Sequence, residues 1–130
     1  HIPFCVEKCF YCDFNSYKIK NKNEKKDYIK SLEKEIYLYK EEFKDKVFDT
    51  IFFGGGTPSI LESEEIELIF SNIYNNFNIS KNAEITIECN PGTLTKKKLQ
   101  TMKNCGVNRL SIGLQTTQNE NLKYIGRIHI

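Results

Sequence analysis

Three cysteines near the start of the chain have the type and spacing of ligands for a metal centre. Cys5, Cys9 and Cys12 form a CxxxCxxC pattern, so one irregular loop can wrap three thiolates around one centre, as an iron–sulfur cluster requires. A structural zinc ion takes four protein ligands, and an electron-carrying [4Fe-4S] cluster takes four cysteines. Three local cysteines therefore favour a [4Fe-4S] cluster with one open iron, although a zinc site and unliganded structural cysteines stay open as alternatives.

The other metal-ligating residue types are predicted to lie outside this site. Cys89 falls on the apolar side of a predicted strand, and Cys105 falls at the end of a predicted helix. An odd number of cysteines, three of them clustered, does not indicate a disulfide framework. His1 and His129 have no companion ligand at a suitable spacing and are predicted to be structural.

A glycine-rich turn, Gly54-Gly55-Gly56-Thr57-Pro58-Ser59, follows an apolar strand. Sites of α/β barrels lie at the carboxyl ends of their strands, and glycines there allow the backbone to approach a ligand closely. A dinucleotide-binding fingerprint would need glycine or alanine where Ser59 stands, and a phosphate-binding Walker loop would need a Gly-Lys-Ser/Thr run that is absent. By itself, the turn is weak evidence for a site.

Hydrophobic periodicity predicts alternating strands and helices that would position these residues. The predicted strands are the residues leading into Cys5 and the ranges 47–53, 83–89 and 107–115, and the predicted helices are 24–43, 63–77, 95–106 and 118–125. Ser63 and Thr95 are expected to cap the second and third helices. This alternation implies parallel strands with right-handed crossovers.

Two predicted strands have one polar face, because alternate residues of a strand share a face. The polar positions are Glu84, Thr86 and Glu88 on one strand and Arg109, Ser111, Gly113 and Gln115 on the next. An open sheet covered by helices would be apolar on both faces, whereas a barrel that receives a ligand has a polar interior. We therefore predict an α/β fold, a partial TIM-type (β/α) barrel with about four of the eight units of a full barrel.

These motifs together resemble the radical S-adenosylmethionine (radical SAM) superfamily, and within it the HemN/HemW group. The resemblance rests on HIPFC, CxxxCxxC, GGGTPS, IECNPGTLT, NRLSIGLQ and GRIH, in this order. It implies that residues 1–130 are the N-terminal portion of a single radical SAM core domain, truncated at both ends. It also implies a [4Fe-4S] cluster on Cys5, Cys9 and Cys12, whose open iron binds S-adenosylmethionine for reductive cleavage to a 5′-deoxyadenosyl radical.

Further residues are implied by the resemblance to contact S-adenosylmethionine: Tyr11, Gly55, Gly56, Thr57, Glu88, Gln115 and Arg127. In HemN-type proteins Gln115 and Arg127 would belong to a second S-adenosylmethionine position, which HemW-type members need not use. Tyr11 also fits a loop aromatic packed for stability, and Arg127 a cation at the end of the last helix.

Phe14 separates two activities within the group. HemN-type coproporphyrinogen III oxidases have a further cysteine at this position, whereas the run from Cys12 to Tyr17 is similar to HemW-type haem chaperones. The resemblance implies a haem chaperone that delivers haem to haem proteins, with haem or porphyrin, haem-receiving proteins and an electron donor as partners. An oxygen-independent coproporphyrinogen III oxidase and a simple iron–sulfur or zinc module stay open, as do enzymatic activity and a homodimer.

Charge and composition exclude other classes of function. The 130 residues carry 19 basic and 17 acidic side chains, for a net charge of +2, and no basic patch with regularly spaced aromatics indicates nucleic-acid binding. No apolar run approaches the roughly 20 residues of a membrane span, and no secretory signal is recognisable. We expect a cytoplasmic protein without a transmembrane segment.

Overall fold

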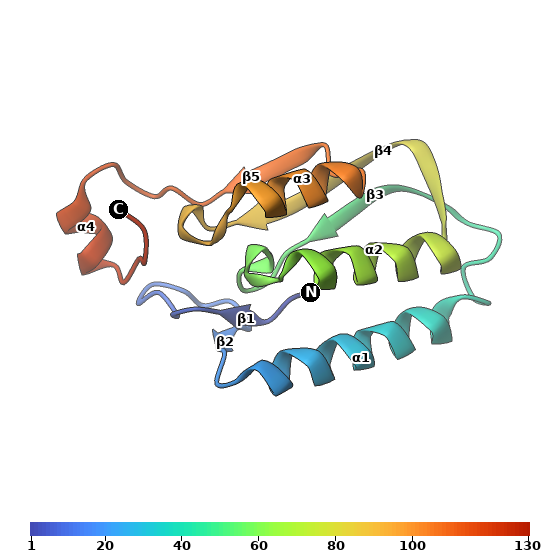
Figure 1. Cartoon of the computed structure of the whole chain (residues 1–130), viewed down its shortest axis with the longest axis horizontal. Helices are drawn as coiled ribbons and strands as arrows, with labels where there is room; N and C mark the ends of the chain where they lie inside the picture. The colour runs from blue at the N-terminus through green and yellow to red at the C-terminus, as the bar shows by residue number, and fades with distance from the viewer.

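A parallel sheet and three long helices form the body of the computed structural model, which describes residues 1–130 (Figure 1). The elements in chain order are β1 (Phe4–Cys5), β2 (Tyr17–Lys18), α1 (Lys22–Tyr39), β3 (Val47–Phe53), the 3₁₀ turn η1 (Pro58–Ile60), α2 (Ser63–Asn76), β4 (Asn78–Cys89), the 3₁₀ turn η2 (Pro91–Thr93), α3 (Lys96–Asn104), β5 (Arg109–Ile112) and α4 (Asn119–Tyr124). The sheet has the order β3-β4-β5 with both pairs parallel, and α2 contacts both α1 and α3. The predicted α/β fold with parallel strands is confirmed.

A short second sheet, β1 paired in parallel with β2, lies beside the end of β3. A parallel bridge joins Ile2 to Gly55, with Ile2 N–H donating to Gly54 O at 2.8 Å and Gly56 N–H donating to Ile2 O at 2.7 Å. The two-residue strand β2 has no periodic pattern, so the sequence did not predict it. The strands form two separate sheets, and closure into a barrel is not seen.

The apolar core lies between the sheet and the helices. Its thirteen buried residues are Ile2, Phe4, Ile29, Phe53, Leu61, Ile66, Ile69, Phe70, Ala83, Ile85, Ile87, Cys89 and Met102. Phe53 of β3 stacks on Phe70 of α2 with ring centroids 4.9 Å apart. Ile85, Ile87 and Cys89 are buried, as the predicted alternation of β4 requires, so the polar positions of that strand face the other way.

The ends of two helices differ from the predicted ends. α1 ends at Tyr39, because the chain then turns and Phe43 packs edge-on against Phe48 and Phe77 instead of continuing the helix. The N-cap of α2 is Glu62, and Ser63 is the first helical residue. The prediction of Ser63 as the N-cap is therefore wrong.

A capping box explains this start of α2. The Glu62 side chain accepts from the backbone of Glu65, and Glu62 N–H donates to the Glu65 carboxylate at 2.7 Å. Thr95 caps α3 as predicted, since its hydroxyl accepts from Lys98 N–H at 3.2 Å.

The bounds of two strands also differ from the prediction. β4 begins at Asn78 rather than Ala83, with a register shift against β3 between Phe48 and Thr50. β5 covers only Arg109–Ile112 of the predicted 107–115. The backbone of Gln115 has φ 68°, which is incompatible with an extended strand.

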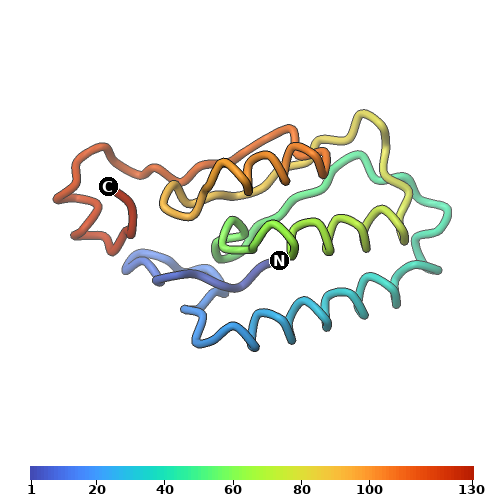
Figure 2. The backbone as a smooth tube through the Cα atoms, viewed as in Figure 1, coloured from blue at the N-terminus to red at the C-terminus, as the bar shows by residue number.

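The first and last parts of the chain lie side by side. Figure 2 shows the loop after β1, in blue, next to the C-terminal segment, in red. Phe10 N–H donates to Ile125 O at 3.2 Å, which fastens this loop to the segment after α4. None of the helices combines the length and the apolar character needed to cross a membrane.

Candidate metal and cofactor site

A cavity of about 270 Å³ lies where β1, β3, β4 and β5 end. Every predicted site residue except Gly55 lines it: Cys5, Cys9, Tyr11, Cys12, Gly56, Thr57, Glu88, Gln115 and Arg127. Carboxyl ends of neighbouring parallel strands meet at one edge, which is where α/β folds build their sites. Residues from five separate segments of the chain are therefore brought to one place.

The glycine-rich turn holds the first cysteine. Thr57 N–H donates to Phe4 O at 2.8 Å, and the Thr57 hydroxyl donates to Cys5 Sγ at 3.4 Å. A Cβ atom on Gly56 would lie 2.7 Å from Phe4 O and 2.9 Å from the carbonyl carbon of Pro3. Only glycine lets these two backbone segments approach so closely.

Backbone and lysine contacts shape the rest of the cysteine loop. Cys12 N–H donates to Cys9 O at 3.1 Å, which makes a tight turn between the second and third cysteines. Lys8 Nζ donates to Phe14 O and Ser16 O, each at 2.9 Å, and so links the two arms of the loop. The loop thus has internal support that does not depend on a bound metal.

No group of three or more His, Cys, Asp or Glu side chains converges on a position for one metal ion. Ligands of a single zinc ion must meet around one point, whereas the cysteines of a cubane cluster bind different irons and lie farther apart. The assignment of Cys5, Cys9 and Cys12 as cluster ligands stays a prediction.

Glu88 faces the cavity from the end of β4, opposite Ser111 of β5. Gly55 N–H donates to its carboxylate at 3.3 Å. Gly55 has φ +117°, a conformation that residues with side chains rarely adopt. Gly55 therefore touches the site through Glu88 rather than by lining the cavity.

Arg127 enters the cavity from the segment after α4. Its Nη1 donates to Cys9 Sγ at 3.6 Å, and its Nη2 donates to Gly113 O. Its Nε is buried without a hydrogen-bond partner. The guanidinium group is thus directed at the cysteine loop and at the end of β5, which places it where an anionic ligand could bind.

Tyr11 lies beside Cys9 and Arg127. Burial raises the pKa of its phenol, the nearby Cys9 raises the pKa further, and Arg127 lowers it. The side chain is 53% exposed, which does not favour a role in packing. Gln115, which is also exposed, lines the same cavity.

Several cavity residues were not predicted as site residues, among them Asn90, Ser111 and Gly113. Ser111 and Gly113 belong to the predicted polar face of the last strand, so the pattern held a signal for both. A Cβ on Gly113 would lie 3.2 Å from Arg127 Nη2, so the guanidinium group would have to shift slightly.

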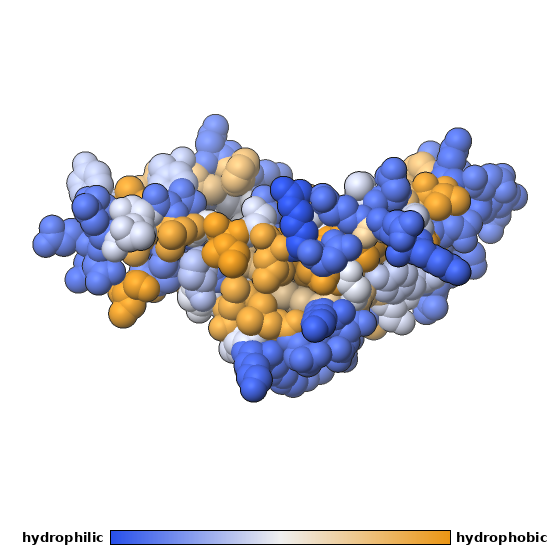
Figure 3. Space-filling model, turned by 90° about the horizontal axis from the view of Figure 1, so that it is seen from above, coloured by the Kyte–Doolittle hydropathy of each residue, from blue (hydrophilic) through white to orange (hydrophobic).

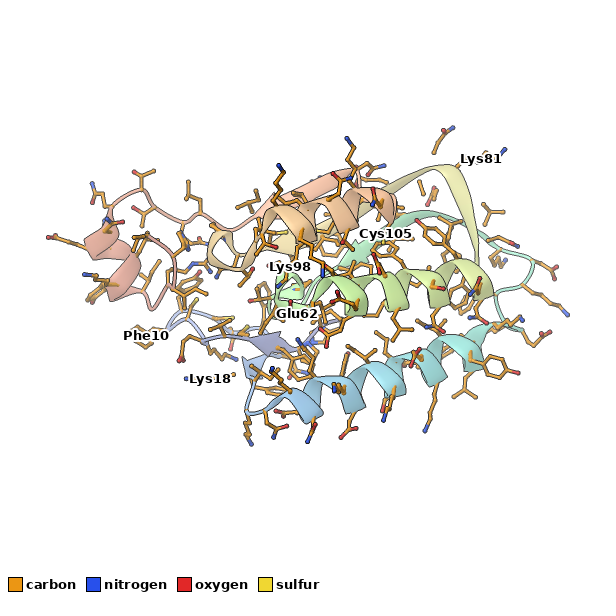
Figure 4. All side chains as sticks on the ribbon, viewed as in Figure 1. Phe10, Lys18, Glu62, Lys81, Lys98 and Cys105 are labelled. Atoms are coloured by element: carbon orange, nitrogen blue, oxygen red, sulfur yellow. The ribbon has the colours of Figure 1, made fainter.

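Two buried residues, Ser59 and Lys98, hold the backbone of Asn90 in place through hydrogen bonds. Ser59 is fully buried, and its hydroxyl accepts from Asn90 N–H at 3.1 Å. Lys98 Nζ donates to Ser59 O at 3.2 Å and lies 3.7 Å from the Glu62 carboxylate, so it joins α3 to the start of α2 (Figure 4). The hydroxyl of Ser59 therefore helps to fix the end of β4.

The two remaining cysteines lie outside the cysteine loop, as predicted, but Cys89 also lines the cavity. Cys89 is in the core, and burial raises the pKa of its thiol to about 11. Cys105 follows α3, and Figure 4 shows it well away from Phe10 at the tip of the cysteine loop. Burial raises the pKa of Cys105, with a smaller contribution from Glu67.

The whole chain is similar to known proteins. The sequence profile of the Radical SAM superfamily matches residues 1–130. The heme chaperone HemW of Buchnera aphidicola subsp. Schizaphis graminum is 47% identical over 133 residues, and that of Escherichia coli (strain K12) is 40% identical over 129 residues. Each alignment covers 99% of this chain and 34% of the relative, so the chain spans about a third of these relatives.

A mitochondrial protein and a solved structure are also similar to this chain. The mitochondrial radical S-adenosyl methionine domain-containing protein 1 of Danio rerio is 35% identical, over 99% of this chain and 29% of that protein. Among solved structures, the coproporphyrinogen III oxidase (HemN) from Escherichia coli, described as a radical SAM enzyme, superimposes with a TM-score of 0.95 at 30% identity. That superposition covers 100% of this chain and 30% of the oxidase chain.

Proposed function

Because this chain belongs to the radical SAM superfamily, we propose that Cys5, Cys9 and Cys12 hold a [4Fe-4S] cluster and that S-adenosylmethionine binds in the adjoining cavity. The observation that carries this proposal is the cavity itself, which gathers the three cysteines with Glu88 and Arg127 at the ends of parallel strands. The cluster, when bound, would supply one-electron reduction of S-adenosylmethionine.

The residues present fit both groups. Thiolates are the ligands that iron–sulfur clusters take, and the loop presents three of them on a backbone held by its own hydrogen bonds. The buried, unpartnered Nε of Arg127 suits an anionic group such as a carboxylate. The Glu88 carboxylate offers an acceptor at the end of β4.

We also propose that the complete protein closes these strands into a (β/α) barrel. The Ile2–Gly55 bridge places β1 next to β3, so that β1, β3, β4 and β5 neighbour one another, all parallel. All four residues of β5 are exposed, and β5 is the edge of its sheet. A further parallel strand could pair with that edge.

For the whole protein, we propose the function of a haem chaperone, with haem as cargo and haem proteins as recipients. This proposal is supported by the 47% and 40% identity to proteins named heme chaperone HemW, against 30% to the oxidase. Phe14, at the position of the additional oxidase cysteine, is 68% exposed and lines the cavity. An electron donor for the cluster and a cytoplasmic location belong to the same proposal.

The oxidase remains the second candidate, because the backbone superimposes on that enzyme with a TM-score of 0.95. It would convert propionates of coproporphyrinogen III to vinyl groups. The two functions predict different products, so they can be separated by assay.

The test uses the full-length protein, reconstituted without oxygen. We expect a [4Fe-4S] absorption band, a paramagnetic resonance signal of the reduced cluster that shifts on addition of S-adenosylmethionine, haem retained after desalting, and no protoporphyrinogen IX. Cys9→Ser should lose the cluster, while the matched control Cys105→Ser should keep it. Protoporphyrinogen formation without haem retention would establish the oxidase, and a signal that S-adenosylmethionine does not shift would rule out both.

A further inference from the structure

Each cysteine of the loop has a separate hydrogen-bonding group next to its sulfur. Thr57 Oγ1 donates to Cys5 Sγ at 3.4 Å, and Arg127 Nη1 donates to Cys9 Sγ at 3.6 Å. Ser16 Oγ lies 3.9 Å from Cys12 Sγ. These distances are within reach of sulfur, whose atomic radius exceeds that of oxygen.

The three groups come from unrelated parts of the chain. Thr57 follows β3 and lies 52 positions from Cys5, and Arg127 follows α4 and lies 118 positions from Cys9. Ser16 lies four positions after Cys12 and is buried. Because the loop sequence alone cannot provide the first two contacts, the fold assembles them.

Thr57 and Arg127 each have a structural reason to remain in place, whereas the Ser16 hydroxyl has to reorient. The backbone N–H of Thr57 is bound to Phe4 O at 2.8 Å, so the hydroxyl stays beside Cys5. The other arm of the Arg127 guanidinium donates to Gly113 O, which orients the fork toward Cys9. The Ser16 hydroxyl also reaches Phe14 O at 3.4 Å, and it would turn from that carbonyl to a Cys12 thiolate because the ionised acceptor is stronger.

We propose that Thr57, Arg127 and Ser16 are positioning residues that donate hydrogen bonds to the cluster-bound sulfurs and raise the reduction potential of the cluster. This inference rests on the proposed function, since it requires a cluster on the three cysteines. The reduction adds one electron from a low-potential donor to [4Fe-4S]²⁺ and gives [4Fe-4S]⁺, with no bond made or broken. Hydrogen bonds to the sulfurs stabilise the more negative state and are a recognised determinant of cluster potential.

The test is a redox titration with dithionite of the reconstituted full-length protein, monitored by paramagnetic resonance. Thr57→Val and Ser16→Ala remove a hydroxyl without changing charge, so any shift reports the hydrogen bond. We expect each variant to shift the ratio of oxidised to reduced cluster about tenfold at a fixed potential, which lowers the midpoint by about 59 mV for one electron. Thr57→Ser should restore the wild-type midpoint. Ser31→Ala, which removes a hydroxyl on α1 that donates to Asp27 O, should not move it.

The outcomes separate this inference from the proposed function. A wild-type protein that assembles no [4Fe-4S] cluster would refute the function itself. A wild-type cluster together with unchanged midpoints in iron-replete Thr57→Val and Ser16→Ala would overturn the inference alone. If Thr57→Val fails to retain iron, Ser16→Ala and the charge-conserving Arg127→Lys decide in the same way, since each should still lower the midpoint.

Discussion

The close contact between Gly56 and β1 predicts that Gly56→Ala destabilises the protein and weakens the cysteine loop. The added Cβ would lie 2.7 Å from Phe4 O, 2.9 Å from Pro3 C and 3.0 Å from Phe4 C. All three atoms belong to the backbone, so no side chain can rotate away, and β1 or the turn has to move. Overpacking of this kind costs about 1–3 kcal/mol, and occasionally more.

The movement would also stretch the hydrogen bonds that hold the two segments together. These are Gly56 N–H to Ile2 O at 2.7 Å and Thr57 N–H to Phe4 O at 2.8 Å. Net loss of one such bond costs about 1 kcal/mol, so we expect Gly56→Ala to reduce the free energy of unfolding by about 2–4 kcal/mol. Cys5 would move with β1, so the iron content after reconstitution should fall as well.

Urea denaturation of the full-length protein, followed by circular dichroism, measures this loss. Gly92→Ala is the matched control, because the nearest atoms to its Cβ would be the Ile128 side chain at 3.4 Å and the His129 Cβ at 3.5 Å. We expect the control to stay within about 0.5 kcal/mol of wild type. Equal stability and equal iron content for Gly56→Ala and Gly92→Ala would refute the reasoning.

Other parts of the fold give four further expectations. Lys25 Nζ and the Glu65 carboxylate are 2.9 Å apart, and their side chains are only 10% and 18% exposed. Lys25→Met leaves the carboxylate without its partner and should lower the free energy of unfolding by about 2 kcal/mol in urea denaturation. An unchanged midpoint would show that the pair contributes nothing. The pKa of about 11 for Cys89 means that its thiol stays protonated at pH 8, so mass spectrometry after native alkylation should find Cys89 unmodified, and early modification would contradict its burial. Because folding raises the pKa of Cys89, its buried thiol contributes fully to the free energy of unfolding below the ordinary pKa of 9.0. This contribution is lost as the pH rises toward 11. Residues 1–130 expressed alone should aggregate or bind iron poorly, because β5 offers an unpaired edge on which Leu110 and Ile112 are exposed. Apolar side chains are also visible across the middle of the face in Figure 3. A fragment that is monodisperse in size-exclusion chromatography and has full iron content would refute this.

The sequence alone determined the alternation of strands and helices and the position of the cysteine loop at the end of a strand. Hydrophobic periodicity is a local property, so the strand 47–53 and the buried alternation of Ile85, Ile87 and Cys89 could be predicted without knowledge of the fold. The spacing of Cys5, Cys9 and Cys12 is local in the same sense. Their placement in one cavity with Glu88 followed from parallel strands ending at one edge.

Features that depend on competition between local interactions were not determined by the pattern. Ser63 and Glu62 both have side chains that can cap a helix, and the reciprocal bond to Glu65 selects Glu62. β5 is shorter than its pattern because its pairing with β4 ends where β4 ends, at the Cys89–Ile112 pair, and the backbone is left-handed at Gln115. The short strand β2 exists because β1 lies beside it, not because of its own residues.

Tertiary structure alone decided which groups stand next to the cysteine sulfurs. Nothing in the spacing of the loop indicates that Thr57 reaches Cys5 or that Arg127 reaches Cys9, since these pairs are 52 and 118 positions apart. Their contacts depend on the Ile2–Gly55 bridge and on the packing of the last segment against the loop. The three cysteines could be identified from their spacing, because a loop brings its own residues together, whereas their hydrogen-bonding environment requires the whole chain to fold.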